Sequence, residues 1–294
     1  MRSTRTAIAA LALAAFGFGA TFVVIKEAIV EVPPMSFVGW RFLLGALVLL
    51  ALAPPRDAAT WRDGVATGVL LFIGYALQTE GLAQTSASNS GLITGLYVVF
   101  TPVVAAVASR TAIRPAVLVG AVVAFIGLAL LTVGSDFGLA AGDLLTVGCA
   151  MAFAAHIVVL SRVAHRHRVI PLTAVQLLVT SVLALGWAVG FDALEVPTGR
   201  PLLAVVVTGL VVSAGAFLVQ VWSQTVIGPN RTALVLALEP VFAAATAAIV
   251  LGERFTTRGW IGAMMILVAI VAVLSAVDSA DDPLPAAESV GPAH

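Results

Sequence analysis

Charged residues are scarce in this 294-residue chain, where they make up 10% of the total, compared with about a quarter of an average soluble domain. Hydrophobic residues make up 61%. The 15 basic and 15 acidic residues are too few to cover the surface of a soluble protein of this size. About ten segments of about 20 apolar residues each would use most of the length. The composition excludes a soluble fold and indicates an all-α polytopic membrane protein.

Several common functional signatures are missing. The one cysteine, Cys149, lies in an apolar run, which excludes a disulfide framework, and there is no CxxC, HExxH, GxxxxGK[ST] or GxSxG string. The net charge is zero and no basic block is present, so the electrostatic footprint of a nucleic-acid-binding protein is absent. We therefore expect no metal, no cofactor, no nucleic-acid partner and no enzymatic activity.

Apolar stretches separated by short polar connections predict ten transmembrane helices. Proline and glycine pairs mark many of the connections, where helices should begin or end. The predicted spans are 7–25, 35–53, 64–83, 88–108, 115–134, 141–161, 171–190, 202–224, 231–251 and 259–277.

The arginines predict the orientation of these spans. With a cytoplasmic amino terminus, ten basic residues fall on the inner side and four on the outer side, as the positive-inside rule requires. Both termini are then cytoplasmic, and residues 278–294 read as a disordered cytoplasmic tail because they have no apolar periodicity. The expected location is the inner, or plasma, membrane.

The chain also contains an internal repeat. Residues 1–139 and 140–277 align with small gaps, which bring Phe18 onto Phe153, Leu43 onto Leu178 and Pro102 onto Pro240. Each half has five predicted spans, and five is odd, so the second half must enter the membrane in the opposite sense. Two inverted five-helix repeats are an architecture of secondary transporters, which alternate between inward and outward states around a midplane site.

Short motifs in both halves carry a family resemblance. They include Gly17-Phe18-Gly19-Ala20, Arg41-Phe42, Gly142-Asp143-Leu144-Leu145, Leu238-Glu239-Pro240 and Leu251-Gly252-Glu253-Arg254. On these residues the chain resembles the drug/metabolite transporter superfamily, in its ten-helix branch of two EamA-type domains. The resemblance covers about residues 7–277 and implies an exporter, in a family whose substrates include amino acids, other metabolites and drugs.

Ionisable groups inside the predicted spans are candidates for proton or ion coupling, because they are rare and unfavourable there. Glu239 lies near mid-depth, and Pro240 leaves the carbonyl of Leu236 without its usual helical partner. Carboxylate and carbonyl together suit a cation, a proton or an amine, although Glu239 could instead only support the kink. His156 could carry a proton or simply be hydrogen-bonded. Pro102, which has no adjacent acid, is expected to break its helix without binding a ligand.

Two predicted spans carry a polar stripe that suits a wet cavity. Tyr75 and Gln78 lie on the third span, and Gln220, Trp222 and Gln224 lie on the eighth. Amides donate and accept hydrogen bonds without charge, so these five residues are candidates for binding a polar or zwitterionic solute. The alternatives are hydrogen bonds between helices for the amides and an interfacial anchor for Trp222.

Arg41, near the start of the second span, has two interpretations. It could pair with a substrate carboxylate, or its long side chain could extend to the outer lipid headgroups. We expect the second.

Together these features predict a secondary carrier that moves a small polar metabolite by alternating access. The expected partners are the substrate, the bilayer and protons, and the chain is a monomer or a homodimer. Three alternatives stay open: an uptake carrier, an intramembrane enzyme acting on lipid or peptide, and a scaffolding or sensory bundle.

Overall fold

The computed structural model describes residues 2–278 apart from 113–114, 133–139, 193 and 255. The described residues form helices and no strand. The α-helices are α1 Arg2–Ala28, α2 Pro34–Leu52, α3 Ala58–Gln84, α4 Ala87–Thr94, α5 Tyr97–Ser109, α6 Pro115–Thr132, α7 Ala141–Val163, α8 Val169–Trp187, α9 Gly199–Val207, α10 Phe217–Gln224, α11 Pro229–Leu236, α12 Leu238–Val250 and α13 Thr257–Asp278. The other helical segments are the 3₁₀ turn η1 Ala164–Arg166 and the π-helices η2 Ala188–Asp192 and η3 Thr208–Ala216. The predicted disordered tail lies almost wholly outside the described residues.

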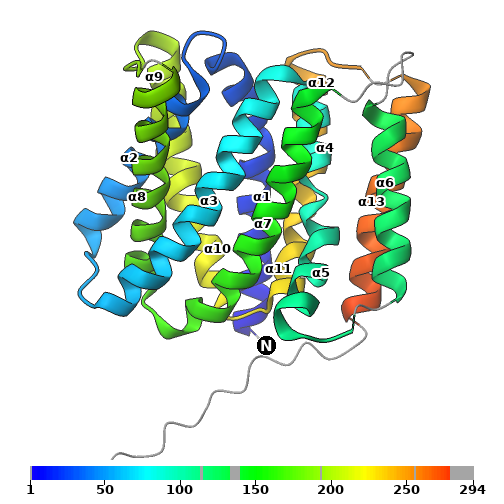
Figure 1. Cartoon of the computed structure of the whole chain (residues 1–294), viewed down its shortest axis with the longest axis horizontal. Coiled ribbons are helices and arrows are strands. Elements are labelled where there is room, and N and C mark those ends of the chain that lie inside the picture. The colour runs from blue at the N-terminus through cyan, green and yellow to red at the C-terminus, as the bar shows by residue number, and fades with distance from the viewer. Residues whose placement is uncertain (1, 113–114, 133–139, 193, 255, 279–294) are drawn as a thin grey trace, which may run out of the picture.

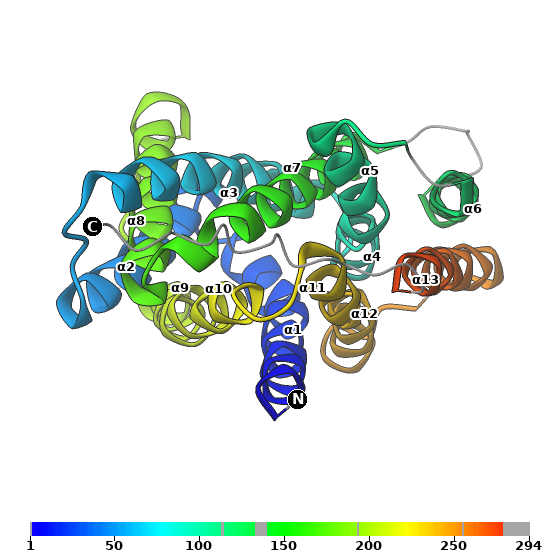
Figure 2. The same ribbon diagram turned by 90° about the horizontal axis from the view of Figure 1, so that it is seen from below.

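Eight helical stretches of the described chain are long and apolar enough to cross a membrane. They are Thr4–Ala28, Pro34–Leu52, Ala58–Gln84, Ala87–Ser109, Ala141–Arg166, Val169–Phe191, Gly199–Gln224 and Arg231–Val250. Two further helices, α6 and α13, pack against each other at one side of the bundle (Figure 1, Figure 2). The predicted polytopic helical membrane fold is therefore confirmed in its class, and each of these eight stretches overlaps one predicted span.

Four predicted spans are not single regular α-helices, and one of them, at 171–190, passes from α8 into the π-helix η2 only at its end. The span predicted at 88–108 consists of α4 and α5, and the span at 231–251 consists of α11 and α12. The span at 202–224 has the nine-residue π-helix η3 at its centre. Between α4 and α5 the amides of Leu96 and Val98 bond three residues back, to the carbonyls of Ile93 and Gly95, which is a 3₁₀ pattern.

The two prolines differ in their distance from these breaks. Pro240 is the third residue of α12, so it lies in the first turn after the break at Ala237. Pro102 lies inside α5, and the helix is interrupted several residues earlier, around Gly95. The expected break at Pro102 is therefore misplaced. The reason is tertiary, because a Cβ atom at Gly95 would lie 2.8 Å from Cγ of Pro240, so the irregular turn of one helix packs on the proline of the other.

The helix contacts follow a symmetric pattern between the two halves of the chain. Helix α2 packs on α8, α4 on α12, α5 on α11 and α6 on α13. Helix α1 contacts α10 and α12, and helix α7 contacts α3 and α5. The list of neighbours is unchanged when α1 is exchanged with α7, α2 with α8, α3 with α10, α4 with α11, α5 with α12 and α6 with α13. Helices of both halves therefore meet in the centre of the bundle (Figure 2).

Candidate functional site

A small cavity of about 30 Å³ lies where the two halves meet. Its lining comes from α1, α3, α5, α7, α10, α11 and α12, and consists of Phe18, Leu71, Tyr75, Tyr97, Phe153, His156, Ile157, Phe217, Gln220, Leu236 and Glu239. We call this space the central cavity. Four of the residues singled out from the sequence come together here, namely Tyr75, His156, Gln220 and Glu239.

The acidic group of the central cavity is held at two helix breaks. Glu239 is the second residue of α12, and Tyr97 is the first residue of α5. The Tyr97 hydroxyl donates to Oε2 of Glu239 over 3.3 Å. Because a helix amino terminus carries a partial positive charge, the first turn of α12 favours a carboxylate at this position. Glu239 is 8% exposed, so this carboxyl group is nearly enclosed by protein.

Close helix packing fixes the position of Glu239. A Cβ atom at Gly19 of α1 would lie 2.5 Å from the carbonyl oxygen of Glu239. Gly95, at the end of α4, also lies against Pro240. Only glycine allows the backbones to approach this closely, so the first turn of α12 is packed tightly on both α1 and the end of α4.

His156 of α7 lies on the cavity wall and is almost fully buried. Its Nε2 is 2.9 Å from Oε1 of Gln176 on α8, and its ring stands edge-on to Phe217. The imidazole is therefore oriented by one hydrogen bond and one aromatic contact beside the cavity.

Aromatic rings form much of the rest of the wall. Tyr75 packs edge-to-face with Phe42 and Phe153, at centroid distances of 4.8 and 5.2 Å. Phe217 packs in the same way on Phe18, at 5.1 Å. Such a wall suits an apolar or aromatic portion of a ligand.

The predicted polar stripe divides between the central cavity and the helix contacts. Tyr75 and Gln220 line the cavity. Gln224, one turn beyond Gln220, donates to the Ile157 carbonyl and to Oγ of Ser161, at 3.2 and 3.0 Å. It therefore joins α10 to α7.

The other two residues of the stripe also lie outside the lining. Gln78 donates to Oγ1 of Thr94 over 3.4 Å, which joins α3 to α4. Trp222 is half-buried and is absent from the cavity wall. The structure thus brings Tyr75 and Gln220 to Glu239 and His156, and leaves Gln78, Trp222 and Gln224 elsewhere.

The expectation for Arg41 is wrong. Its side chain does not reach the headgroups, because it is buried at 1% exposure. The guanidinium carbon lies 4.9 Å from the ring centroids of both Phe42 and Tyr75, and these rings hold the charge inside the bundle.

The sequence profile of the EamA-like transporter family matches residues 5–133 and 140–275. The chain belongs to this family. An uncharacterized transporter of Archaeoglobus fulgidus is 31% identical over 263 residues, covering 90% of this chain and 84% of that protein. The uncharacterized transporter YvbV of Bacillus subtilis is 30% identical over 207 residues, covering 65% of this chain and 66% of that protein. A protein of known crystal structure has the same fold, with a TM-score of 0.68 at 21% identity over 94% of this chain and 99% of that chain.

Tyr97 is the functional candidate of this EamA-like transporter that sequence reasoning missed. The chain has two tyrosines, Tyr75 and Tyr97, and both lie in the middle of predicted spans. Tyrosine normally favours the membrane interface, so a tyrosine at mid-depth is itself a signal of a polar interior. That signal identifies both residues of the cavity wall.

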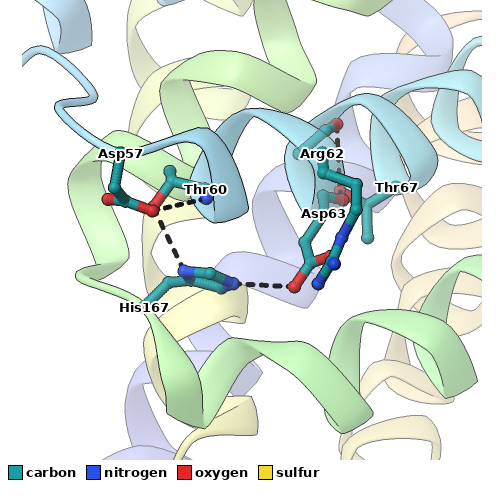
Figure 3. Close-up of polar contacts among 7 residues, drawn as sticks. Asp57, Thr60, Arg62, Asp63, Thr67 and His167 are labelled. Atoms are coloured by element: carbon teal, nitrogen blue, oxygen red, sulfur yellow. Dashed lines mark hydrogen bonds and ion pairs between the residues drawn. The ribbon is translucent and has the colours of Figure 1, made fainter.

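At one end of the transporter a polar cluster joins α3 to the turn between α7 and α8 (Figure 3). His167 lies 3.1 Å from Oγ1 of Thr60 and 2.8 Å from Oδ2 of Asp63. Asp57 caps α3 by accepting from both the amide and the hydroxyl of Thr60. These two hydrogen bonds lower the pKa of the Asp57 carboxyl group below its usual value.

At the other end, two charged side chains bond to the connection between α3 and α4. Nζ of Lys26 donates to the carbonyls of Leu82 and Thr85. The Glu253 carboxylate accepts from the amides of Ala87 and Ser88, each over 3.0 Å. These contacts tie α1 and the segment after α12 to the ends of α3 and α4.

Within the described part of the chain, no group of three or more His, Cys, Asp or Glu side chains is placed to hold a metal ion. The family and the names of the relatives indicate a transporter rather than an enzyme.

Proposed function

We propose that this EamA-like protein is an inner-membrane secondary carrier that exports a small polar metabolite, amino-acid-like or drug-like, by alternating access. The observation that carries the proposal is the position of the central cavity at the breaks of two interrupted helices, α4–α5 and α11–α12. Broken helices at mid-depth supply helix termini and free backbone groups to a bound solute, and they are a recurring feature of secondary transporters.

The proposed architecture is ten transmembrane helices in two inverted five-helix repeats. The symmetric exchange of helix neighbours supports it, as does the family profile, which matches the chain twice. Helix breaks in the fourth and ninth proposed spans support it as well. The proposed repeats divide at residues 139 and 140, at the edge of a segment that lies outside the described residues.

In the proposed orientation both termini are cytoplasmic. The loop before α3 and the turn between α7 and α8 lie at the same end of the bundle as the amino terminus (Figure 1). This end carries Arg56, Arg62, Arg166 and Arg168 around one hollow. Its charge fits the cytoplasmic side by the positive-inside rule.

Roles within the central cavity follow from the contacts. We assign solute binding to Tyr75 and Gln220, which line the cavity together with the aromatic rings. We assign proton coupling to Glu239 and His156, which line the same cavity. Gln78 and Gln224 hold helices together. Pro240 shapes the turn that presents Glu239, whereas Pro102 has no ligand role.

Export profiling tests the proposal. The protein is overexpressed in a bacterial host, and the extracellular metabolites are compared with those from Glu239→Gln and Gln220→Ala variants at equal membrane levels. The matched control is Glu31→Gln, since Glu31 is exposed and lies outside the cavity lining. We expect one or a few metabolites to accumulate outside only with the unmutated protein and the control.

An unchanged extracellular profile at verified protein levels would contradict the export function. A fall in external metabolites would instead indicate uptake, and the same variants would then abolish it.

A further inference from the structure

Arg41 is a buried cation that has no acidic partner among the residues that the structure describes. Its Nε donates to Oγ of Ser213 over 3.2 Å, and its Nη1 has no hydrogen-bond partner among the same residues. None of the ion pairs in the described part of the chain includes it. A charge inside a membrane span is strongly unfavourable unless it is paired or functional. The unpartnered nitrogen therefore indicates that the Arg41 guanidinium binds a ligand.

The backbone beside Arg41 is also irregular. Ser213 lies in the π-helix η3, and π-helical segments are rare and frequently occur at functional sites. The helices approach closely here, because a Cβ atom at Gly45 would lie 3.0 Å from the carbonyl oxygen of Gly209. The result is that η3 presents the Ser213 hydroxyl directly to the guanidinium.

One aromatic layer separates Arg41 from the central cavity. The Tyr75 ring lies 4.9 Å from the guanidinium carbon, and Tyr75 also lines the cavity. Phe42 and Phe217 complete this layer, each at a centroid distance of 6.0 Å or less from Tyr75. Tyr75 therefore contacts Arg41 with its ring and also lines the cavity, and Phe217 lies beside it.

We propose that Arg41 is the anion-binding residue of the transport pathway, and that the exported solute carries a carboxylate which binds to it when Tyr75 and Phe217 turn aside. This inference rests on the proposed carrier function. A guanidinium offers a planar pair of donors that matches the two oxygens of a carboxylate, and the aromatic layer contacts the hydrocarbon part of the same solute. The carboxylate of the solute would be the negatively charged partner of the Arg41 guanidinium, which has none among the described residues.

The test uses the purified full-length protein in liposomes loaded with matched probes. The probes are phenylalanine and leucine, their carboxamides, and the amines that lack the carboxyl group. Release of each compound is followed by mass spectrometry, and protein-free liposomes give the background. The wild-type protein should release the acids faster than the amides and amines of the same carbon skeleton.

Three variants at the site then test Arg41 itself. Arg41→Met keeps the apolar volume and removes the charge, and it should slow release of the acids about tenfold or more while leaving the amides little changed. Arg41→Lys keeps the positive charge but lacks the planar pair of donors. Its rate of acid release should lie between those of the wild type and Arg41→Met. Ser213→Ala should shift the acid-to-amide ratio in the same direction, and Arg200→Gln is the control because Arg200 is exposed at the start of α9.

The outcomes separate the two proposals. Release of amides or amines but not of acids, or an unchanged acid-to-amide ratio in folded Arg41→Met, overturns the role of Arg41 and leaves the carrier function standing. Release of none of the probes by the wild-type protein counts against both. If Arg41→Met does not fold, an unchanged ratio in both Arg41→Lys and Ser213→Ala overturns the inference.

Discussion

Tyr97 and Glu239 are separated by 142 positions in sequence and are joined by a hydrogen bond of 3.3 Å between the Tyr97 hydroxyl and Glu239 Oε2. Each residue directly follows a break in its own transmembrane stretch. The bond therefore links the two interrupted helices across the central cavity. A movement that separates α5 from α12 must break it, which makes it a natural point of coupling between solute binding and helix movement.

Removing the charge of Glu239 should uncouple transport from protons. In liposomes with an imposed proton gradient, we expect Glu239→Gln to lose about tenfold or more of the gradient-driven rate, while exchange of solute without a gradient continues. Tyr97→Phe keeps the carboxylate and should retain the dependence on the gradient. Gradient-driven transport by Glu239→Gln at the wild-type rate would contradict a coupling role.

Adding one methyl group at Gly19 should destabilise the protein, because its Cβ would meet the backbone of Glu239 and Ala243 at 2.5 and 2.9 Å. We expect Gly19→Ala to lower the free energy of unfolding by about 1–3 kcal/mol and to slow transport. Gly186→Ala is the matched control, since a Cβ there meets nothing within 4 Å. Thermal unfolding in detergent measures the stability of the two variants. Equal melting temperatures would contradict the close packing of α1 on the first turn of α12.

The contact of Glu253 with the start of α4 should stabilise the folded protein. Glu253→Ala leaves the amides of Ala87 and Ser88 without their acceptors, and we expect a loss of about 1–3 kcal/mol in the free energy of unfolding. Glu27→Ala removes an exposed carboxylate at the end of α1 and should change little. Thermal unfolding of the two variants provides the measurement. A lower melting temperature in Glu27→Ala but not in Glu253→Ala would contradict the stabilising role of the Glu253 contact.

Asp57 should contribute a pH-dependent part of the stability. Its pKa is lowered by hydrogen bonds from Thr60, so its stabilising effect is present above the usual carboxyl pKa of about 4 and is lost as the pH falls through the lowered value. Asn caps a helix nearly as well as Asp and does not titrate. Asp57→Asn should therefore melt like the wild type at neutral pH and show a smaller decrease of melting temperature in acid, which a pH series of melting curves will test.

Topology reporters fused after single loops should test the inverted architecture. Fusions after Arg56 and Arg166 should report the cytoplasm, and fusions after Glu31, Ser86 and Glu195 should report the outer side, as the proposed orientation requires. The same side for Glu31 and Arg56 would rule out that α2 crosses the membrane. Reversed signals at all five sites would invert the proposed orientation.

The sequence determined the class of fold and the approximate limits of the spans, because about 20 apolar residues between polar, proline-marked connections leave few alternatives to a transmembrane helix. It also pointed to Glu239, His156, Tyr75 and Gln220, since polar groups are rare in such segments.

Tertiary structure alone decided which polar residues share the central cavity. Gln220 and Gln224 lie on one face of the same stretch, yet one lines the cavity and the other bonds to α7. Arg41 is buried behind Tyr75, and Tyr97 reaches Glu239 from the other half of the chain. The physical reason is that a membrane helix is apolar toward lipid as well as toward its neighbours, so hydrophobic periodicity does not tell its inner face from its outer one, and only packing between distant segments assigns each polar group its partner.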